Sequence, residues 1–191
     1  MNSDPDAELV LACQRTSATS LEGDYRTLYD RYKDRVFNVC FRITGNPSDA
    51  LDASQETFGI VFRRIREFRF ESRFSSWVYR VAVNASIDMR RRARSRRVVS
   101  LDALQDPIDH LEMPSVSASR RELEFEVQRA ILKLSPKLRA TVVLRYMENL
   151  SYEEVADAMR VSLGTVKSRL ARAHEALDRD LTPTLDKHYL G

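Results

Sequence analysis

Five polar or basic side chains lie close together near the C-terminal end of the chain, where they could bind DNA: Thr165, Lys167, Ser168, Arg169 and Arg172. Hydroxyl and guanidinium groups form hydrogen bonds with base edges and with phosphate oxygens. They reach one groove together only if a helix carries them and buries its opposite side. The apolar residues that recur at helical spacing supply that buried side: Val166, Leu170, Ala173 and Leu177.

Two helix-start signals frame this segment. Ser151 and Glu154 have the spacing of a capping box. Ser162 is a second N-cap, so the first helix must end near Met159 and a tight turn must follow. This pattern predicts a helix-turn-helix whose second helix enters a major groove. The alternative interpretation is an amphipathic surface helix with solvated charges.

A second candidate site is the basic and aromatic stretch from Arg63 to Arg97. It holds twelve arginines and three acidic residues, a net charge of +9, so the rest of the chain carries −6. Such segregation produces a local field that a polyanion can use. The aromatic residues within it could stack on unpaired bases: Phe68, Phe70, Phe74, Trp77 and Tyr79. Phe74 and Trp77 could equally be core residues, and for Trp77 alone we favour the core.

The residues upstream predict a series of helices. A short helix is expected over 5–15, and a longer amphipathic helix ends at Gly45. Asn46 and Pro47 start the next helix, which is predicted to bury Leu51, Phe58, Val61, Phe62 and Ile65. The other side of that helix carries Asp52, Gln55, Glu56, Gly59 and Arg63.

The third long helix of this half is predicted to start at a cap formed by Ser72 or Ser75. Its buried stripe contains Phe74, Trp77, Val78, Val81 and Ala85, and its opposite face carries Arg80, Asn84, Ile87 and Arg91.

The composition changes abruptly after Arg97. Residues 98–119 hold two prolines, several serines, four acidic residues and no Lys or Arg, as expected of a flexible acidic linker. Helical periodicity resumes at Arg120, and Ser135-Pro136 starts a further helix. We therefore predict an all-α protein with an N-terminal domain (1–97), the linker (98–119), a C-terminal helix-turn-helix domain (120–181) and a tail (182–191).

Several functional classes are not supported by the sequence. It has no run of 18 apolar residues and no secretory signal, which argues against a membrane span and favours the cytoplasm. Cys13 and Cys40 stand alone, and the three histidines lie far apart, so neither a metal site nor a disulfide is predicted. No cofactor motif and no catalytic constellation is present, and we expect a protein that is not an enzyme.

Four stretches together resemble the extracytoplasmic function (ECF) group of bacterial RNA polymerase sigma factors. They are residues 49–58, residues 74–84 followed by Asp88 and the arginine run, residues 134–139, and residues 164–173. They occur in the family order and cover about residues 20–180. Arg160 stands where the family usually has Gly, so the turn must hold a non-Gly residue in a conformation that Gly prefers. Ala53, Ser54 and Phe62 also replace the larger residues that are usual in the family.

The resemblance implies a function and a role for each stretch. The clamp of the β′ subunit of core RNA polymerase is expected to bind Asp49, Asp52, Gln55, Glu56 and Phe58. The promoter −10 element is expected to contact Arg69, Arg73, Tyr79, Arg80, Asn84, Ile87 and Arg91, with a flipped base captured by the loop at 69–73. The −35 element is expected to contact Ser162, Thr165, Lys167, Ser168, Arg169 and Arg172.

The resemblance also implies further partners, namely the flap of the β subunit and an anti-sigma factor. Two alternatives remain open at this stage. A stand-alone helix-turn-helix regulator would leave the basic and aromatic stretch unexplained. A nuclease would need convergent metal-binding carboxylates or histidines, and none has usable spacing.

Overall fold

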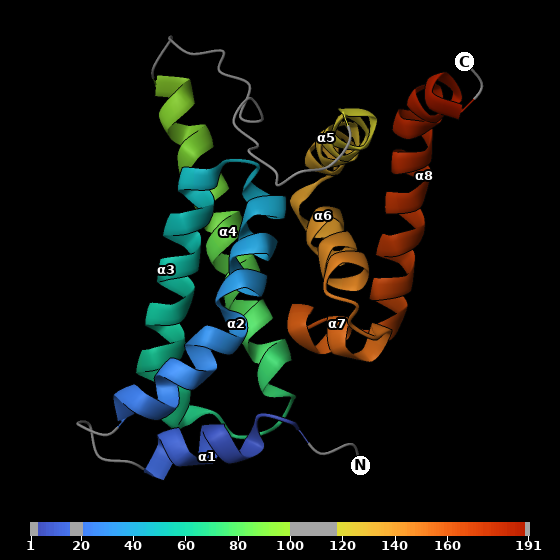
Figure 1. Cartoon of the computed structure of the whole chain (residues 1–191). Helices are drawn as coiled ribbons and strands as arrows, with labels where there is room; N and C mark the ends of the chain where they lie inside the picture. The colour runs from blue at the N-terminus through green and yellow to red at the C-terminus, as the bar shows by residue number, and fades with distance from the viewer. Residues whose placement is uncertain (1–3, 16–20, 100–117, 190–191) are drawn as a thin grey trace.

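The computed structural model describes residues 4–15, 21–99 and 118–189, and within these ranges every regular element is helical (Figure 1). The N-terminal half contains α1 (Ala7–Arg15), α2 (Leu21–Thr44), α3 (Pro47–Arg64), the 3-10 turn η1 (Ile65–Glu67) and α4 (Phe74–Val99). Helices α2, α3 and α4 pack as a bundle, and α1 lies across one end of it. The predicted all-α class is confirmed.

The C-terminal half contains α5 (Ala118–Lys133), α6 (Pro136–Val142), the π-helical segment η2 (Val143–Met147), α7 (Tyr152–Met159) and α8 (Leu163–Tyr189). Helix α8 continues beyond residue 181, where the sequence suggested that a separate tail begins. Most of the predicted linker, residues 100–117, lies outside the described residues. No helix in the described part of the chain is long and apolar enough to cross a membrane.

The junction between α2 and α3 follows its sequence signals. Gly45 has φ +76°, a left-handed conformation that ends α2 at little steric cost. The Asn46 side chain accepts a hydrogen bond from the Asp49 N–H at 3.0 Å, and Pro47 occupies the first turn of α3. Gly45 is also needed for packing, because a Cβ there would lie 2.6 Å from Leu132 of α5.

The predicted buried face of α3 was partly wrong. Leu51 and Phe62 are 51% and 41% exposed, whereas the small residues Ala53 and Thr57 are fully buried. Small side chains let α3 approach α2 and α4 closely, so the buried face is rotated toward them. The Phe62 ring packs instead on the edge of Tyr25, with 4.8 Å between the centroids.

The start of α4 also differs from the prediction. The helix begins at Phe74, so Ser75 lies inside it and neither serine is the residue that precedes it. The Phe74 N–H donates to the Asp4 carboxylate at 2.7 Å, and the cap therefore comes from the N-terminal segment. A capping partner so distant in sequence leaves no local signal.

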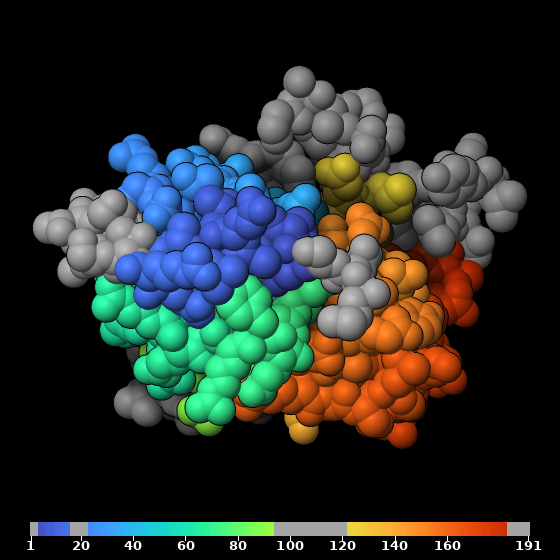
Figure 2. Space-filling model, turned by 90° about the horizontal axis from the view of Figure 1, so that it is seen from below, coloured from blue at the N-terminus to red at the C-terminus, as the bar shows by residue number. Residues whose placement is uncertain are grey.

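The two halves pack directly against each other (Figure 2), and their buried apolar residues form one continuous cluster. At one end, Arg42 of α2 donates to the Gln128 carboxamide of α5 at 2.8 Å. Beside this contact, the buried Arg139 guanidinium of α6 donates to the Ile43 carbonyl of α2 at 2.7 Å. At the other end, α4 lies against α7, so the helix-turn-helix is next to the basic half.

Candidate nucleic-acid interface

The helix-turn-helix has the predicted caps. The Ser151 hydroxyl accepts from the Glu154 N–H at 3.1 Å, and Glu154 Oε2 accepts from the Ser151 N–H at 2.8 Å, which completes the capping box. Helix α7 ends at Met159, and Arg160 adopts the left-handed conformation at φ 50° that the sequence required. The Thr165 N–H donates to the Ser162 hydroxyl at 3.1 Å, so Ser162 caps α8 as expected.

Helix α8 buries Val166, Leu170 and Ala173, as predicted, whereas the fourth predicted residue, Leu177, is only half-buried. Lys167, Ser168 and Arg172 are exposed on its other side, together with Ser162. Thr165 and Arg169 are half-buried. The helix thus presents hydroxyl groups and cations on one side, which is the arrangement needed to enter a major groove.

The residues expected to bind the polymerase clamp fall into two sets on α3. Asp52 and Gln55 are exposed, beside the exposed Leu51. The other three residues are half-buried: Glu56 lies 3.7 Å from Arg92, Phe58 packs against the Tyr29 ring, and Asp49 donates its main-chain N–H to the helix cap. Asp52 and Gln55 are therefore the polar side chains that this face leaves most available to another protein.

The residues expected to bind the −10 element lie in the loop before α4 and along α4. Arg69, Asn84 and Arg91 are exposed, and Ile87 is half-buried. A cavity of about 260 Å³ opens beside the loop, and Arg69, Trp77 and Arg80 line it. Its wall also includes Arg160 from the helix-turn-helix. Burial lowers the pKa of the Arg80 guanidinium, and the nearby positive charge of Arg160 lowers it further.

Three of the expected −10 contacts are instead occupied by the C-terminal half. Arg73 Nη1 lies 2.5 Å from Glu154 Oε1, and the Arg80 Nη2 group donates to the Asp157 carbonyl at 2.7 Å. The Tyr79 ring is 1% exposed, and its hydroxyl donates to the Glu148 carboxylate at 2.6 Å. DNA can reach Tyr79 only if the two halves separate.

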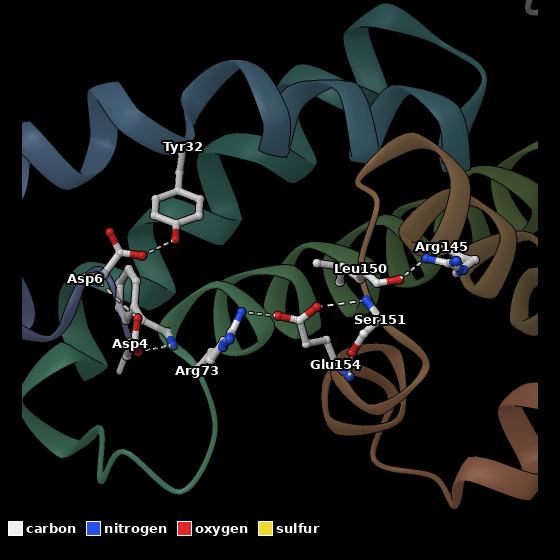
Figure 3. Close-up of polar contacts among 9 residues, drawn as sticks. Asp4, Asp6, Tyr32, Arg73, Arg145, Leu150, Ser151 and Glu154 are labelled. Carbon is white, nitrogen blue, oxygen red and sulfur yellow. Dashed lines mark hydrogen bonds and ion pairs between the residues drawn. The ribbon is translucent and has the colours of Figure 1, made fainter. Parts of the chain in front are cut away.

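Glu154 holds two parts of the molecule with one carboxylate. One of its oxygens completes the capping box of α7, and the other receives Arg73 from the loop before α4 (Figure 3). The ion pair is partly shielded from water, since its side chains are 35% and 20% exposed. The same residue therefore starts the first helix of the helix-turn-helix and attaches it to the N-terminal half.

The −10 face and the −35 helix face each other across a second cavity of about 280 Å³. Arg80, Asn84 and Ile87 of α4 line one side, and Lys137 and Arg169 line the other side. Among the residues expected to contact the −35 element, Arg169 lines this cavity, whereas Lys167, Ser168 and Arg172 remain exposed on α8. Glu148 lies at the same interface, where burial raises the pKa of its carboxyl group while the Tyr79 hydroxyl and Arg35 partly oppose that rise.

Sequence reasoning missed four residues that position this region: Asp4, Gln14, Glu148 and Arg139. Each acts through a contact with a partner far away in sequence or through a main-chain group. Arg139 alone had a signal, because it ends one of the stretches that resemble the sigma factor family. Among the described residues, no cluster of three or more acidic, His or Cys side chains could hold a metal ion.

The fold and these surfaces define a two-part helical DNA-binding protein with a C-terminal helix-turn-helix. Residues 28–96 match the family model of sigma-70 region 2, and residues 124–177 match that of sigma-70 region 4. The chain belongs to the ECF group of the sigma-70 family of RNA polymerase sigma factors.

Two relatives show how far the similarity extends. The chain is 34% identical to the ECF RNA polymerase sigma factor SigW of Bacillus subtilis, over 82% of this chain and 88% of that one. It is 33% identical to the RNA polymerase sigma-H factor of Pseudomonas aeruginosa, over 97% of this chain and 98% of that one. The fold resembles that of the sigma factor RpoE from Bartonella quintana, which was solved in complex with the anti-sigma factor NepR. The TM-score is 0.67, with 20% sequence identity, and the match covers 83% of this chain and 97% of that one.

Proposed function

We propose that this sigma factor binds core RNA polymerase through α3 and directs it to promoters by contacting the −10 and −35 elements with α4 and α8. The observation that carries the proposal is the separation of three surfaces on one chain. Asp52 and Gln55 are exposed on α3, the loop and exposed face of α4 are basic, and α8 presents the side chains of a recognition helix. Each surface lies in a segment that matches the family.

The exposed part of α3 suits a protein partner better than DNA. Leu51 and Phe62 are large apolar side chains of the same helix that remain 51% and 41% exposed, and Leu51 is next to Asp52 in sequence. Apolar surface surrounded by polar groups is characteristic of protein–protein contacts. We assign this face to the clamp of the β′ subunit, and we assign the contact with the flap of the β subunit to the C-terminal half.

The contacts between the halves give the protein a closed arrangement that must open for promoter binding. Tyr79 cannot contact a −10 strand while it is buried against Glu148, and Arg73 and Arg80 are each engaged by the C-terminal half, through Glu154 and the Asp157 carbonyl. Core polymerase could drive the opening if it binds the separated halves more tightly than the packed ones, because a ligand shifts such an equilibrium only through differential affinity. DNA binding is therefore expected to depend on polymerase.

The remaining parts of the proposal concern partners and location. An anti-sigma factor would have a ready target in the same exposed apolar face of α3, where it would compete with the polymerase clamp. The protein is proposed to act in the cytoplasm with polymerase and to perform no covalent chemistry. The N-terminal domain is proposed to end near residue 97 and the C-terminal domain to begin near residue 120, close to the end of the first matched region at 96 and the start of the second at 124.

The test is run-off transcription with purified core polymerase, combined with co-elution of the protein and core enzyme. The double variant Asp52→Ala and Gln55→Ala should fold normally, since surface changes usually cost within about 0.5 kcal/mol, yet it should lose co-elution. Asn84→Ala should keep co-elution but reduce permanganate reactivity of unpaired thymines at the −10 element. Glu175→Ala removes an exposed carboxylate from α8 and serves as the control.

Two results would contradict the proposal. Unchanged co-elution of the double variant would show that α3 is not the polymerase contact. A gel shift in which the wild-type protein alone binds duplex promoter DNA as tightly as it does with core enzyme would favour a stand-alone regulator instead.

A further inference from the structure

The N-terminal segment, residues 4–15, lies outside both matched regions but contacts both ends of the loop that precedes α4. That loop comprises residues 68–73, between η1 and Phe74. It includes Arg69 and Arg73, and it borders the cavity beside Trp77. Helix α1 packs against α2 and against η1, so it lies beneath the point where the loop begins.

Gln14 holds the beginning of the loop. Its Nε2 group donates to the Ile65 carbonyl at 3.0 Å and to the Phe68 carbonyl at 2.8 Å. A carboxamide has two N–H donors, and both are used here on main-chain groups of one turn. The path of the chain as it leaves η1 is therefore set by a side chain more than fifty residues away.

Asp4 holds the end of the loop. Its Oδ2 atom accepts from the N–H of Phe74, the first residue of α4, at 2.7 Å. The first N–H groups of a helix have no partner within the helix, and a carboxylate is favoured there by the helix dipole. The other oxygen, Oδ1, accepts from the Asp6 N–H at 3.0 Å, which orients the carboxylate (Figure 3).

The segment has an anchor of its own that does not involve the loop. Asp6 is 2% exposed and accepts hydrogen bonds from the Tyr32 hydroxyl and from Arg31 of α2. Val10 and Cys13 are fully buried in the core. Gln14 and Asp4 thus extend from a fixed support to the two ends of the loop.

The loop has a reason to need this support. Phe70, near its centre, has φ 57°, a left-handed conformation that is unfavourable for a bulky residue and persists only where the surroundings impose it. The Phe68 ring packs against Phe70 and Trp77, with centroid distances of 5.0 and 5.2 Å. If either end of the loop were free, relaxation of Phe70 would carry Arg69 and the cavity wall with it.

We propose that residues 4–15 are a positioning element for −10 recognition, in which Gln14 and Asp4 fix the two ends of the 68–73 loop in the conformation that binds the unpaired strand. The inference rests on the proposed function of that loop. Neither side chain needs to touch DNA. Loss of one such hydrogen-bonded clamp should weaken binding of the −10 strand about tenfold, as expected for roughly one to two hydrogen bonds.

The experiment uses the full-length protein bound to core polymerase and fluorescent single-stranded −10 oligonucleotides that carry each of the four bases at the captured position. The variants are Gln14→Leu, Gln14→Glu and Asp4→Ala. Gln14→Glu keeps the shape of the side chain but cannot donate to the two carbonyls, so it separates the loss of hydrogen bonds from the loss of packing. Glu8→Ala removes an exposed carboxylate from the same helix and is the control.

We expect all three variants to bind the oligonucleotides about tenfold more weakly with a flattened base preference, while co-elution with core enzyme stays unchanged. Hydrogen exchange should rise in residues 68–74 and not in α2 or α3. Wild-type strand affinity and base preference in the variants would overturn the inference. So would an equal loss of core binding or of protection throughout the N-terminal half, because the segment would then support the whole fold. If wild-type holoenzyme shows no affinity for the strand, the proposed function itself fails.

Discussion

Replacement of Arg139 by Met should destabilise the protein more than any other single arginine substitution proposed for the C-terminal half. The Arg139 side chain is 2% exposed, and its guanidinium donates to four main-chain carbonyls. Three of them belong to the end of α5 and the residue that follows it: Ile131 at 3.0 Å, Leu134 at 2.8 Å, and Leu132. The fourth is the Ile43 carbonyl at the end of α2, at 2.7 Å.

The charge is stabilised by helix ends. The last carbonyls of an α-helix have no partner within the helix and carry partial negative charge, and here two helices end at one guanidinium. Met is similar in length and apolar, so Arg139→Met leaves little cavity but removes every donor. The Leu132 and Leu134 carbonyls then lose the guanidinium donor, whereas the Ile131 carbonyl still accepts from the Leu134 N–H at 3.2 Å and the Ile43 carbonyl still accepts from Arg90 at 3.1 Å.

The expected loss follows from these contacts. A hydrogen bond to a charged group contributes about 1.5–3 kcal/mol, and each buried carbonyl that is left without a partner costs about 1–3 kcal/mol. We expect about 4 kcal/mol on this basis. With a urea m value of about 2 kcal/mol per M, the unfolding midpoint should fall by about 2 M. Circular dichroism against urea concentration measures this shift.

Arg145→Met is the matched control. Arg145 is half-buried in η2 and donates to a single carbonyl, that of Leu150 at 2.8 Å. It also lies over the Tyr152 ring, at 5.2 Å from the centroid. Its replacement should cost about 1–2 kcal/mol. If Arg139→Met were no more destabilising than Arg145→Met, the reasoning from shared helix ends would be refuted.

Three further predictions concern the interface and the two binding faces. Glu148→Gln should strengthen packing of the two halves at neutral pH. Burial raises the pKa of the Glu148 carboxyl group, so protonation favours the packed arrangement. This stabilisation is complete below the usual Glu pKa and is lost as the pH rises through the raised pKa. Fluorescence energy transfer between labels on α3 and α8 would show a pH-dependent efficiency in the wild type, and the same dependence in Glu148→Gln would rule this out. Leu51→Ala should weaken co-elution with core polymerase, and its cost in stability should be within about 0.5 kcal/mol. Ile65→Ala changes a fully buried residue and should cost about 2–5 kcal/mol, which urea unfolding of the two variants would show. Unchanged co-elution of Leu51→Ala would count against an apolar contact. Arg169→Ala or Arg172→Ala should lose about 1–3 kcal/mol of binding free energy and change the base selected from a promoter library randomised at −35. Lys167→Ala should weaken binding to all sequences alike. If neither arginine variant alters the selected sequence, DNA shape must supply the specificity.

The helix boundaries near strong local signals could be predicted from the sequence. Ser151 with Glu154, Ser162, and Asn46 with Pro47 each start a helix where expected, because a capping side chain satisfies main-chain groups within three residues of itself. The left-handed turn at Arg160 was expected on a different ground, since the family that the chain resembles usually has Gly at this position. Local chemistry of this kind is almost independent of the rest of the fold.

The buried side of α3 was harder to predict because two kinds of residue competed for it. Periodicity favoured the large apolar side chains Leu51 and Phe62, but the structure buries the smaller Ala53 and Thr57. How closely the neighbouring helices approach decides which side is buried, and spacing along one helix contains no such information. The result leaves large apolar groups on the face that we assign to a partner.

By itself the sequence determined the helical class, the order of the helices, the helix-turn-helix and the family, since each depends on residues that are neighbours along the chain. Only the tertiary structure decided that Asp4 and Gln14 hold the two ends of the loop before α4, that Arg139 joins the ends of α2 and α5, and that Glu154 holds Arg73 across the interface between the halves. These contacts join groups that are five to ninety-six residues apart. Their partners are often main-chain carbonyls and N–H groups, which every residue type carries, so no pattern of side chains along the chain could have revealed them.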